Sequence, residues 1–419
     1  MRTRTLLTFG LLVATVAAAS SSASARSVER RADPGFVAST FAQTGGTPSS
    51  LAWGKDTRGG KGTRLYVADN SGNQVLVIDD LGGAGSTPTV FATGFRGPLG
   101  VLPARDGSLY VTDAEAAREG PFGLRSYGRV WRVFDTDHDG VADKKYVVLK
   151  DLPNGRHNTN GMAFGPDGML YVANGNSTDD GTDGGETEVK PWSGSLVRVD
   201  PDARNVSITA LPRRKTLVAS GWRNVYDVAF SPVEPNYAFV PMNGVDDARE
   251  GSTGENPADP DIRSSDDVLF ATNVADRHRD NFRFPSCLYN VEERGNLTPY
   301  DNPNAKTIET FGHCPTSSVP RPVGSFGLHV SADGAAFQTT GNWGAAYRNN
   351  LFVAEWGSLF GAPTGHQIAR VVLTKDGLRV ASISDFLDVD TPLDVTFDRA
   401  GVMYVADYSG SIVRVDQVP

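Results

Sequence analysis

The sequence predicts an all-β protein, a six-bladed β-propeller built from four-stranded antiparallel blades. Two observations support this prediction. The composition is that of a packed, turn-rich protein, since the 419-residue chain contains 46 glycines, 25 prolines and 39% hydrophobic residues. A pattern of two β-strands joined by a tight turn also recurs six times, and a third strand pattern follows most of the copies.

Each repeat contains a small or polar residue, an apolar segment, a turn with Gly or Asp, and a strand resembling LYVA. Apolar residues alternate with small or polar ones, which is the period-two pattern of a β-strand. Segments such as PDG supply the tight turns. One small sheet cannot bury both faces alone, so repeated sheets are expected to pack around a common axis. The six copies lie at residues 50–69, 100–113, 161–174, 227–243, 327–340 and 394–407.

The two ends of the chain are expected to share one blade. The strand pattern STFAQT near residue 39 precedes the first repeat and is available to complete the last blade. The widest interval between repeats, residues 243–327, is rich in Pro, Asp, Asn and Gly. We interpret it as a long excursion that carries a disulfide, and a seventh blade in this interval is the alternative.

The N-terminus has the pattern of a secretory signal peptide. Arg2 and Arg4 precede an apolar run at residues 6–19 and a small-residue cleavage site at 23–25. No later stretch approaches the ~20 apolar residues that a membrane span requires. We therefore expect a secreted, extracellular protein. Its parts are a signal peptide (1–25), a short leader or propeptide (26–35) and one propeller domain (36–419).

Net charge, cysteines and sequons give further information about binding partners and covalent modifications. The net charge of −9 argues against nucleic acid or an anionic membrane as a partner. Cys287 and Cys314 are expected to form one disulfide in an oxidising compartment, and a reactive thiol or redox pair is the alternative. N-glycosylation sequons at Asn176, Asn205 and Asn296 suggest a glycoprotein, although chance gives about as many.

A set of polar residues is expected at one mouth of the central shaft. The first strand of each blade lines the shaft, and the loop that enters this strand opens on one face. Two arginines, a histidine and a carboxylate at such positions indicate a pocket for an anionic ligand beside an acid/base group. A solvated mouth without function is the alternative. The residues four positions before the predicted first strands are Gly46, Arg96, His157, Arg223, Val323 and Asp390.

The segment FDTDHDGVADKKY at residues 134–146 has the pattern of a calcium-binding loop. Acidic side chains and one backbone carbonyl fall at loop positions 1, 3, 5, 7 and 9. Tyr146 replaces the bidentate glutamate of an EF-hand, and the flanking strand patterns predict a β-hairpin. We expect a structural Ca²⁺, because crowded carboxylates repel one another without a cation; a solvated Asp-rich turn is the alternative. The predicted ligands are Asp135, Asp137, Asp139, Val141 and Asp143.

Other site chemistries lack their sequence patterns. The histidines at positions 278, 313, 329 and 366 do not have the spacing of zinc ligands. The glycine stretch at residues 59–62 is not followed by the Gly-Lys-Ser/Thr of a phosphate loop. The chain also lacks the Gly-x-Ser-x-Gly motif of a serine hydrolase.

Several segments resemble, in order along most of the chain, the soluble quinoprotein glucose/sorbosone dehydrogenases. This family consists of six-bladed propellers that use pyrroloquinoline quinone (PQQ) and Ca²⁺. The segments that carry the resemblance are His157 with GMAFGPDGMLYVANG (161–175), GWRNVYDVAF (221–230), MNGVDD (242–247), NFRFPSCLYN (281–290), NNLFVAEWGS (349–358) with PTGHQIARV (363–371), and TPLDVTFDRAGVMYVAD (391–407).

The resemblance implies a PQQ-dependent sugar dehydrogenase that passes electrons to an external acceptor. His157 would be the general base that takes the hydroxyl proton of the sugar while hydride moves to PQQ. The same resemblance places the cofactor Ca²⁺ near backbone oxygens of Gly244 and Val245. A lactonase or lyase that uses His157 as its base and a non-catalytic propeller that binds carbohydrate or protein are the alternatives. The residues assigned to the cofactor pocket are Arg223, Asn224, Arg96 and Asp390.

This chain departs from the family pattern at several basic positions. It reads DVDTPLDV where the family often has an arginine, and HNTNGM lacks a basic residue soon after His157. Arg96 is the candidate to compensate for this missing charge.

Overall fold

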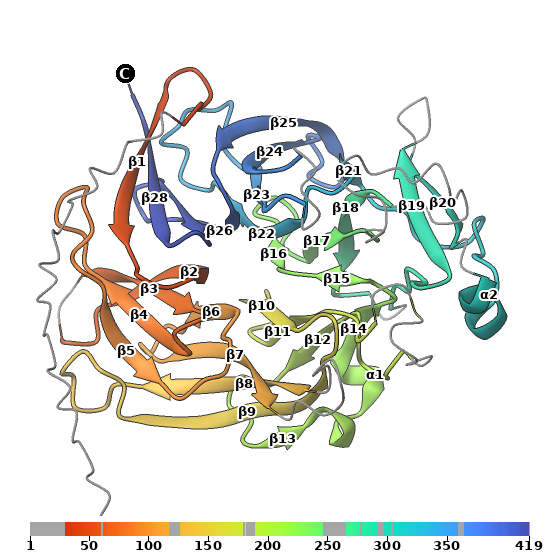
Figure 1. The fold of residues 1–419 in the computed structure, drawn as a ribbon, viewed down its shortest axis with the longest axis horizontal. Helices are drawn as coiled ribbons and strands as arrows, with labels where there is room; N and C mark the ends of the chain where they lie inside the picture. The colour runs from red at the N-terminus through yellow and green to blue at the C-terminus, as the bar shows by residue number, and fades with distance from the viewer. Residues whose placement is uncertain are drawn as a thin grey trace, which may run out of the picture.

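Six antiparallel sheets surround a central shaft (Figure 1), which confirms the predicted six-bladed β-propeller. The computed structural model describes residues 30–59, 62–116, 126–178, 181, 189–245, 265–276, 279–291, 297–302, 305–358 and 364–418. The predicted signal peptide and the first part of the predicted leader lie outside these residues. Within the described residues, no helix is both long and apolar enough to cross a bilayer.

The first three blades follow the chain order, and the first strand of each lines the shaft. Blade 1 contains β2 (Pro48–Lys55), β3 (Thr63–Asp69), β4 (Gln74–Ile78) and β5 (Thr89–Thr93). Blade 2 contains β6 (Gly100–Pro103), β7 (Leu109–Ala116), β8 (Ser126–Phe134) and β9 (Lys144–Pro153), with the short β13 (Val206–Ser207) added in parallel. Blade 3 contains β10 (Thr159–Phe164), β11 (Leu170–Asn174), β12 (Ser195–Val199) and β14 (Leu217–Ser220); η2 (Ile208–Ala210) and α1 (Arg213–Thr216) precede β14.

The other three blades complete the ring. Blade 4 has an inner edge in two pieces, β15 (Asn224–Val225) and β16 (Ala229–Phe230), followed by β17 (Tyr237–Asn243), β18 (Asp267–Asn273) and β21 (Gly324–Gly327). Blade 5 contains β22 (Ala332–Phe337), β23 (Leu351–Glu355), β24 (Gln367–Leu373) and β25 (Val380–Asp388). Blade 6 contains β26 (Pro392–Phe397), β27 (Met403–Asp407), β28 (Ser411–Gln417) and β1 (Phe36–Gln43).

The N-terminal strand closes the ring, as the sequence predicted. β1 pairs antiparallel with β28, from Phe36 opposite Gln417 to Gln43 opposite Ser411. Blade 6 therefore takes three strands from the end of the chain and its outermost strand from the beginning. Because this pairing joins the two ends of the propeller, the ring cannot open without breaking a full strand ladder.

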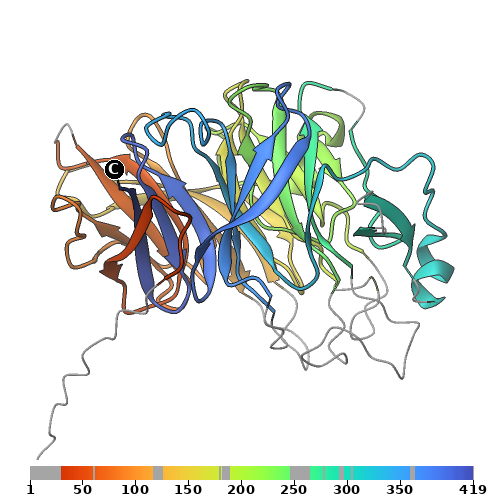
Figure 2. The ribbon, with the colours of Figure 1, turned by 90° about the horizontal axis from the view of Figure 1, so that it is seen from above.

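The interval between residues 243 and 327 completes blade 4 and carries the predicted excursion. It contributes β18 and β21 to the blade, and between them a hairpin of β19 (Cys287–Val291) and β20 (Leu297–Asp301) with α2 (Ala305–Phe311). The predicted disulfide joins Cys287 and Cys314, which are 27 residues apart. Figures 1 and 2 show that the hairpin and α2 project beyond the ring of blades.

The strands of the fifth repeat were assigned incorrectly from the sequence: the predicted inner strand of blade 5 overlaps the outer strand of blade 4. The sequence predicted a first strand directly after residue 327, but β21 ends there as the outer strand of blade 4. His329 and Ser331 have positive φ angles of 60° and 52°, which interrupt the extended chain. The inner strand is instead β22, whose small residues suit the crowded shaft: a Cβ on Gly334 would lie 2.4 Å from Asp394 Oδ1.

Apolar side chains pack between neighbouring blades. Tyr171 of blade 3 meets Phe230 of blade 4 with ring centroids 5.1 Å apart. Phe239 of blade 4 meets Phe337 of blade 5 at 5.7 Å. All five residues of β11 are buried, because both faces of a middle strand are covered by adjacent blades. Removal of this apolar surface from water is the main stabilisation of the ring.

Tyr226 crosses the shaft. Its hydroxyl donates a hydrogen bond to the carbonyl oxygen of Ser49 at 3.1 Å, which joins blade 4 to blade 1 on the opposite side of the ring. Its own carbonyl accepts the N–H of Gly161 in blade 3 at 2.7 Å. Burial raises the pKa of Tyr226, with nearby aspartates adding to the effect, so the hydroxyl keeps the proton that it donates.

Two aspartates connect neighbouring inner strands. Asp394 Oδ2 accepts the N–H of Leu51 at 2.9 Å, and Asp227 Oδ2 accepts the N–H of Ala335 at 3.0 Å. A Cβ on Gly161 would lie 2.1 Å from Asp227 Oδ1, so this carboxylate fits only because its neighbour has no side chain. Burial raises the pKa of both carboxyls, that of Asp394 to about 6.

Tyr226→Phe tests the bond across the shaft. The variant keeps the aromatic ring but leaves the buried Ser49 carbonyl without this donor, so we expect a loss of about 1–2 kcal/mol in the free energy of unfolding. Urea unfolding measures the change, and Tyr127→Phe, at a half-exposed position on β8, is the matched control. Equal unfolding midpoints for wild type and Tyr226→Phe would contradict this role.

Candidate functional site

The inner strands all begin on one face of the ring, here called the proximal face. It carries segments that enter inner strands, such as 155–158 and 328–331, and segments that follow second strands, such as 175–178 and 356–358. Strands alternate in direction within each blade, so the turns after first and third strands lie on the opposite, distal face. Apart from Val323, which precedes the outer strand β21, the residues predicted to surround the mouth of the shaft are therefore proximal.

His157 is oriented by the backbone of Asn176. Its Nδ1 lies 2.9 Å from the Asn176 carbonyl oxygen, and its main-chain N–H donates to the same oxygen at 3.3 Å. A carbonyl only accepts hydrogen bonds, so Nδ1 carries the proton. In the neutral ring the basic lone pair then belongs to Nε2. A histidine held in this tautomer can accept a proton at Nε2.

Arg223 and Asn224 lie beside His157, as predicted. Gly175 lies between the side chains, since a Cβ on it would be 2.4 Å from His157 Cβ and 2.9 Å from Asn224 Oδ1. The N–H of Asn176 donates to the Arg223 carbonyl at 2.6 Å, so Asn176 holds both His157 and Arg223. The Arg223 side chain is buried, and its Nη1 donates to the Asn243 carbonyl at 3.4 Å.

Asn243 continues this set of contacts into blade 5. Its Nδ2 donates to Ser331 Oγ at 2.6 Å and to Asp333 Oδ1 at 3.1 Å. Its Oδ1 is buried and has no hydrogen-bond partner among the described residues. A buried amide oxygen without a donor is uncommon in proteins, and amide oxygens are good ligands for Ca²⁺. The side chain is thus suited to receive a cation or a donor group from a ligand.

Asp267 links blade 4 to the segment that enters blade 5. Its Oδ2 accepts the N–H groups of Val330 at 2.8 Å and Ser331 at 2.7 Å, and its Oδ1 accepts the N–H of Gly244. Burial raises the pKa of nearby Asp333, and the charge of Asp267 raises it further, whereas the hydrogen bond from Asn243 opposes the shift. Asp333 therefore favours its protonated form.

Gly244 and Val245, the predicted backbone ligands, lie next to several carbonyl oxygens. A Cβ on Gly244 would lie 2.1 Å from the Ser265 oxygen and 2.6 Å from the Asp266 oxygen. The Val245 carbonyl accepts the N–H of Ser265 at 3.0 Å, and the Val245 N–H donates to Ser265 Oγ at 2.8 Å. The predicted ligands thus belong to an oxygen-rich part of the proximal face.

Arg96 and Asp390 are exposed on the proximal face and are held through their backbones. The N–H of Arg96 donates to Asp113 Oδ2 at 3.1 Å, and its carbonyl accepts the N–H of Ala114 at 3.0 Å. The Asp390 carbonyl accepts a hydrogen bond from His366 Nδ1. Both side chains project from loops that enter inner strands, as the repeat pattern predicted.

The sequence analysis missed two residues of this face. Val323 belongs to blade 4, where its N–H donates to the Leu269 carbonyl, and the segment that enters the inner strand of blade 5 contains the buried His329. The shifted fifth repeat concealed it. Lys190 Nζ donates to the Asn154 carbonyl at 3.3 Å, which places a cation beside the loop of His157. No local sequence signal marks this contact between residues 36 positions apart.

The predicted calcium loop lies on the distal face, because it connects third strand β8 to fourth strand β9. Asp135, Asp137 and Asp139 each bring one carboxylate oxygen within 4.8 Å of the others. Asp143 instead accepts the N–H of Thr136 at 3.0 Å, and the Val141 N–H donates to Asp139 Oδ1 at 2.7 Å. Three of the five predicted ligands are therefore close together, on the face opposite to that of His157.

Glu355, at the end of β23, is a pH-sensitive group of the proximal face. Burial raises its pKa to about 8, although a hydrogen bond from Gln367 Nε2 at 2.7 Å opposes the shift. Between its ordinary value of 4.5 and about 8, the folded protein holds a proton that the unfolded chain has released. A rise in pH through this range therefore favours unfolding.

Glu355→Gln should weaken this pH dependence. The amide carries no charge, so the free energy of unfolding should fall less between pH 5 and pH 8 than in the wild type. Each pKa unit corresponds to about 1.4 kcal/mol, so the difference is several kcal/mol at most. Urea unfolding at both pH values measures it, with Glu234→Gln, on an exposed turn, as the control. Parallel pH profiles for wild type and Glu355→Gln would exclude this assignment.

Several solved structures have a fold similar to that of this chain. No curated protein sequence matches the chain. Among solved structures, the chain is similar to the calcium structure of Trichoderma reesei Carbohydrate-Active Enzymes Family AA12, with 16% identity, a TM-score of 0.68, and coverage of 93% of this chain and 97% of that one. It is also similar to the holo form of the pyranose dehydrogenase PQQ domain from Coprinopsis cinerea (15% identity, TM-score 0.69, coverage 92% and 97%).

A third similar structure is the soluble aldose sugar dehydrogenase of Escherichia coli in its apo form (17% identity, TM-score 0.62, coverage 91% and 99%). At these identities the similarity shows the fold alone, and at that level it confirms the resemblance to sugar dehydrogenase propellers. Residues 59–408 match a family that is described as a domain of unknown function, DUF7133. Because the match covers most of its length, the chain belongs to the DUF7133 family.

Proposed function

We propose that the protein is a secreted oxidoreductase that oxidises a sugar with PQQ and Ca²⁺. The observation that carries this proposal is the continuous set of contacts from His157 through Asn176 and Arg223 to Asn243. It combines a base in a defined tautomer with a buried guanidinium and an oxygen-rich region on one face. The predicted signal peptide (1–25), leader (26–35) and propeller domain (36–419) are part of the same proposal.

The residues present fit the proposed cofactor. PQQ is a tricarboxylate, and planar guanidinium groups are well suited to carboxylates. Arg223 supplies a buried guanidinium, and Lys190 and Arg96 add positive charge on the proximal face. When bound, PQQ would take up hydride from the substrate carbon, and Ca²⁺ would polarise the quinone carbonyl.

A Ca²⁺ ion bound with PQQ would find oxygen donors nearby. Asn243 Oδ1 is buried and lacks a hydrogen-bond partner among the described residues, which is a specific reason to place a cation there. Gly244 lies against the carbonyl oxygens of Ser265 and Asp266. Oxygen ligands are those that Ca²⁺ prefers.

His157 would remove the hydroxyl proton of the sugar as the hydride leaves the same carbon. Nε2 accepts the proton, because the hydrogen bond from Nδ1 to Asn176 fixes the other nitrogen as a donor. The same bond stabilises the imidazolium that forms, since its donor becomes more positive. The side chain is only partly buried, so the proton can pass to solvent, and the two electrons pass to an external acceptor.

Activity with His157 variants tests this proposal. Purified protein with PQQ and Ca²⁺ should oxidise at least one of a panel of aldoses, measured by reduction of an artificial electron acceptor. His157→Gln should lower kcat by about 10²–10⁴-fold while PQQ still binds, since the general base is lost. His313→Gln, at an exposed position near the disulfide, should retain activity. Absence of both PQQ uptake and dye reduction with every sugar would refute the proposal and favour a binding propeller.

Cofactor uptake with Arg223 variants tests the cofactor site. Arg223→Ala should weaken PQQ binding in equilibrium dialysis at least about tenfold, because a buried charge-assisted contact is lost. Arg223→Lys keeps the charge without the planar fork and should bind PQQ with intermediate affinity. Arg105→Ala, at an exposed position on a distal turn, is the control. Thermal unfolding without PQQ shows whether each variant is folded; unchanged PQQ affinity in folded Arg223→Ala would remove Arg223 from the site.

A further inference from the structure

The turn between β8 and β9 joins blade 2 to blade 1 on the distal face. His138 Nδ1 donates to the Thr57 carbonyl at 2.9 Å, and the N–H of Ala142 donates to the Phe91 carbonyl at 2.7 Å. Thr57 belongs to the turn after β2, and Phe91 belongs to β5, so both contacts are with blade 1. The turn is therefore part of the boundary between two blades.

This boundary contains a cluster of negative charge. Asp135, Asp137 and Asp139 bring carboxylate oxygens within 4.8 Å of one another. Arg58 and Arg64 pack near Gly140 of the same turn, but the ion pairs they form are with Asp56 and Asp79. Three carboxylates at this separation repel one another unless a cation lies between them.

Two buried oxygens beside the cluster indicate a missing ligand. Asp135 is 7% exposed, and its Oδ2 accepts the N–H of Gly140 at 2.8 Å. Asp135 Oδ1 and the buried Thr57 Oγ1 make no hydrogen bond of ordinary geometry within the described part of the chain, although the Thr57 hydroxyl lies close to the Asp135 carboxyl. Such buried oxygens are costly in a folded protein unless an ion, water or donor satisfies them.

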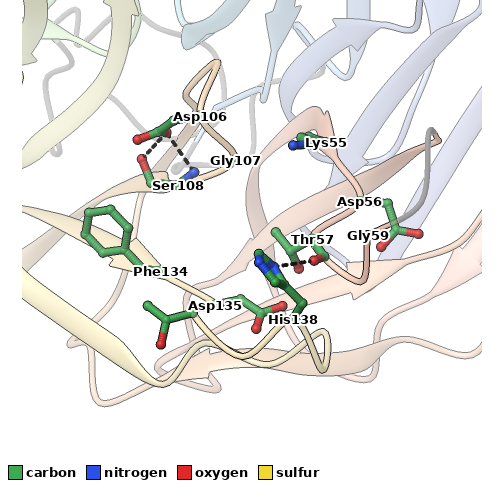
Figure 3. Close-up of a pocket in the computed structure, with 11 residues that line it drawn as sticks. Lys55, Asp56, Thr57, Gly59, Asp106, Gly107, Ser108, Phe134, Asp135 and His138 are labelled. Atoms are coloured by element: carbon green, nitrogen blue, oxygen red, sulfur yellow. Dashed lines mark hydrogen bonds between the residues drawn. The ribbon is translucent and has the colours of Figure 1, made fainter.

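Both residues line a pocket of about 450 Å³ between the blades. Figure 3 shows Asp135, Thr57 and His138 together at one end of this pocket, with Asp106 and Ser108 at the other. The pocket gives solvent and small ions a path to the two oxygens. The cluster thus combines negative charge, oxygen atoms that lack hydrogen bonds, and a pocket through which a small ion can reach them.

We propose that Ca²⁺ binds at this blade boundary, between the carboxylates of the β8–β9 turn and Thr57, and clamps blade 1 to blade 2. All the donors are oxygen atoms, which favours Ca²⁺ over zinc or copper. Asp135, Asp137 and Asp139 supply the charge, and Thr57 Oγ1 supplies a neutral ligand from the other blade. The bidentate glutamate of an EF-hand is replaced by Tyr146, so binding should be in the weaker range of extracellular calcium sites, about 10⁻⁴–10⁻³ M.

Calcium titration of PQQ-free, chelator-treated protein tests the site. Calorimetry and thermal unfolding up to about 10 mM CaCl₂ should show binding and a rise in the unfolding midpoint of at least about 2 °C. Asp137→Asn and Asp139→Asn should lower the calcium affinity at least about tenfold, since each removes a charged ligand. Without calcium, both variants should be as stable as the wild type or more so, because repulsion in the cluster falls.

Two further variants identify the position of the ion. Asp376→Asn, in an exposed turn of blade 5, should retain the full calcium response. Asn243→Ala removes the unsatisfied amide oxygen of the proximal face, and this variant should also keep the full calcium response. The proposal is overturned if calcium neither binds nor stabilises the wild type, or if Asp137→Asn keeps the response. If Asn243→Ala alone loses the calcium response, the ion lies on the proximal face, and the proposal is again overturned.

Discussion

The close approach of six inner strands at the shaft is the constraint on which the rest of the structure depends. At two of the junctions between inner strands, one strand has a glycine and the other supplies an aspartate. Gly161 leaves room for Asp227, and Gly334 leaves room for Asp394. The polar group then accepts an N–H of the adjacent inner strand, as Asp394 does from Leu51. Tyr226 completes the pattern by connecting opposite sides of the ring.

This crowding explains why the candidate site lies at the ends of the inner strands. The side chains of Tyr226, Asp227 and Asp394 lie buried in the shaft and are engaged in hydrogen bonds with backbone groups. The segments that enter the inner strands lie at the proximal ends of these strands. There backbone carbonyls orient the side chains of the same blade, as Asn176 does for His157 and Asn243 does for Arg223. The N–H of Asn176 also donates to the Arg223 carbonyl, which joins blade 3 to blade 4. Rigid strands thus position reactive groups on short loops.

The sequence was sufficient for the features that repeat and insufficient for those that depend on distant contacts. Blade number, ring closure by β1 and the proximal position of His157 follow from a two-residue periodicity and its recurrence. His329 was missed because the apolar residues after Gly327 resemble a strand, while the true inner strand β22 consists mainly of small residues. Asp267 could not be assigned, because its carboxylate binds N–H groups 63 and 64 positions away. Lys190 was missed for the same reason.

The two faces differ in the donors that they would offer to a cation, and this difference bears on function. On the distal face, three carboxylates lie close together in the β8–β9 turn, and together they would neutralise a divalent ion. An ion held in that way has no remaining charge to attract an anionic cofactor, so its effect is on the blade boundary. On the proximal face, Asn243 Oδ1 and backbone carbonyls are neutral, Asp267 is engaged with three N–H groups, and burial favours the protonated form of Asp333. A divalent ion there would keep most of its charge and, with Arg223, would attract a carboxylate-bearing cofactor.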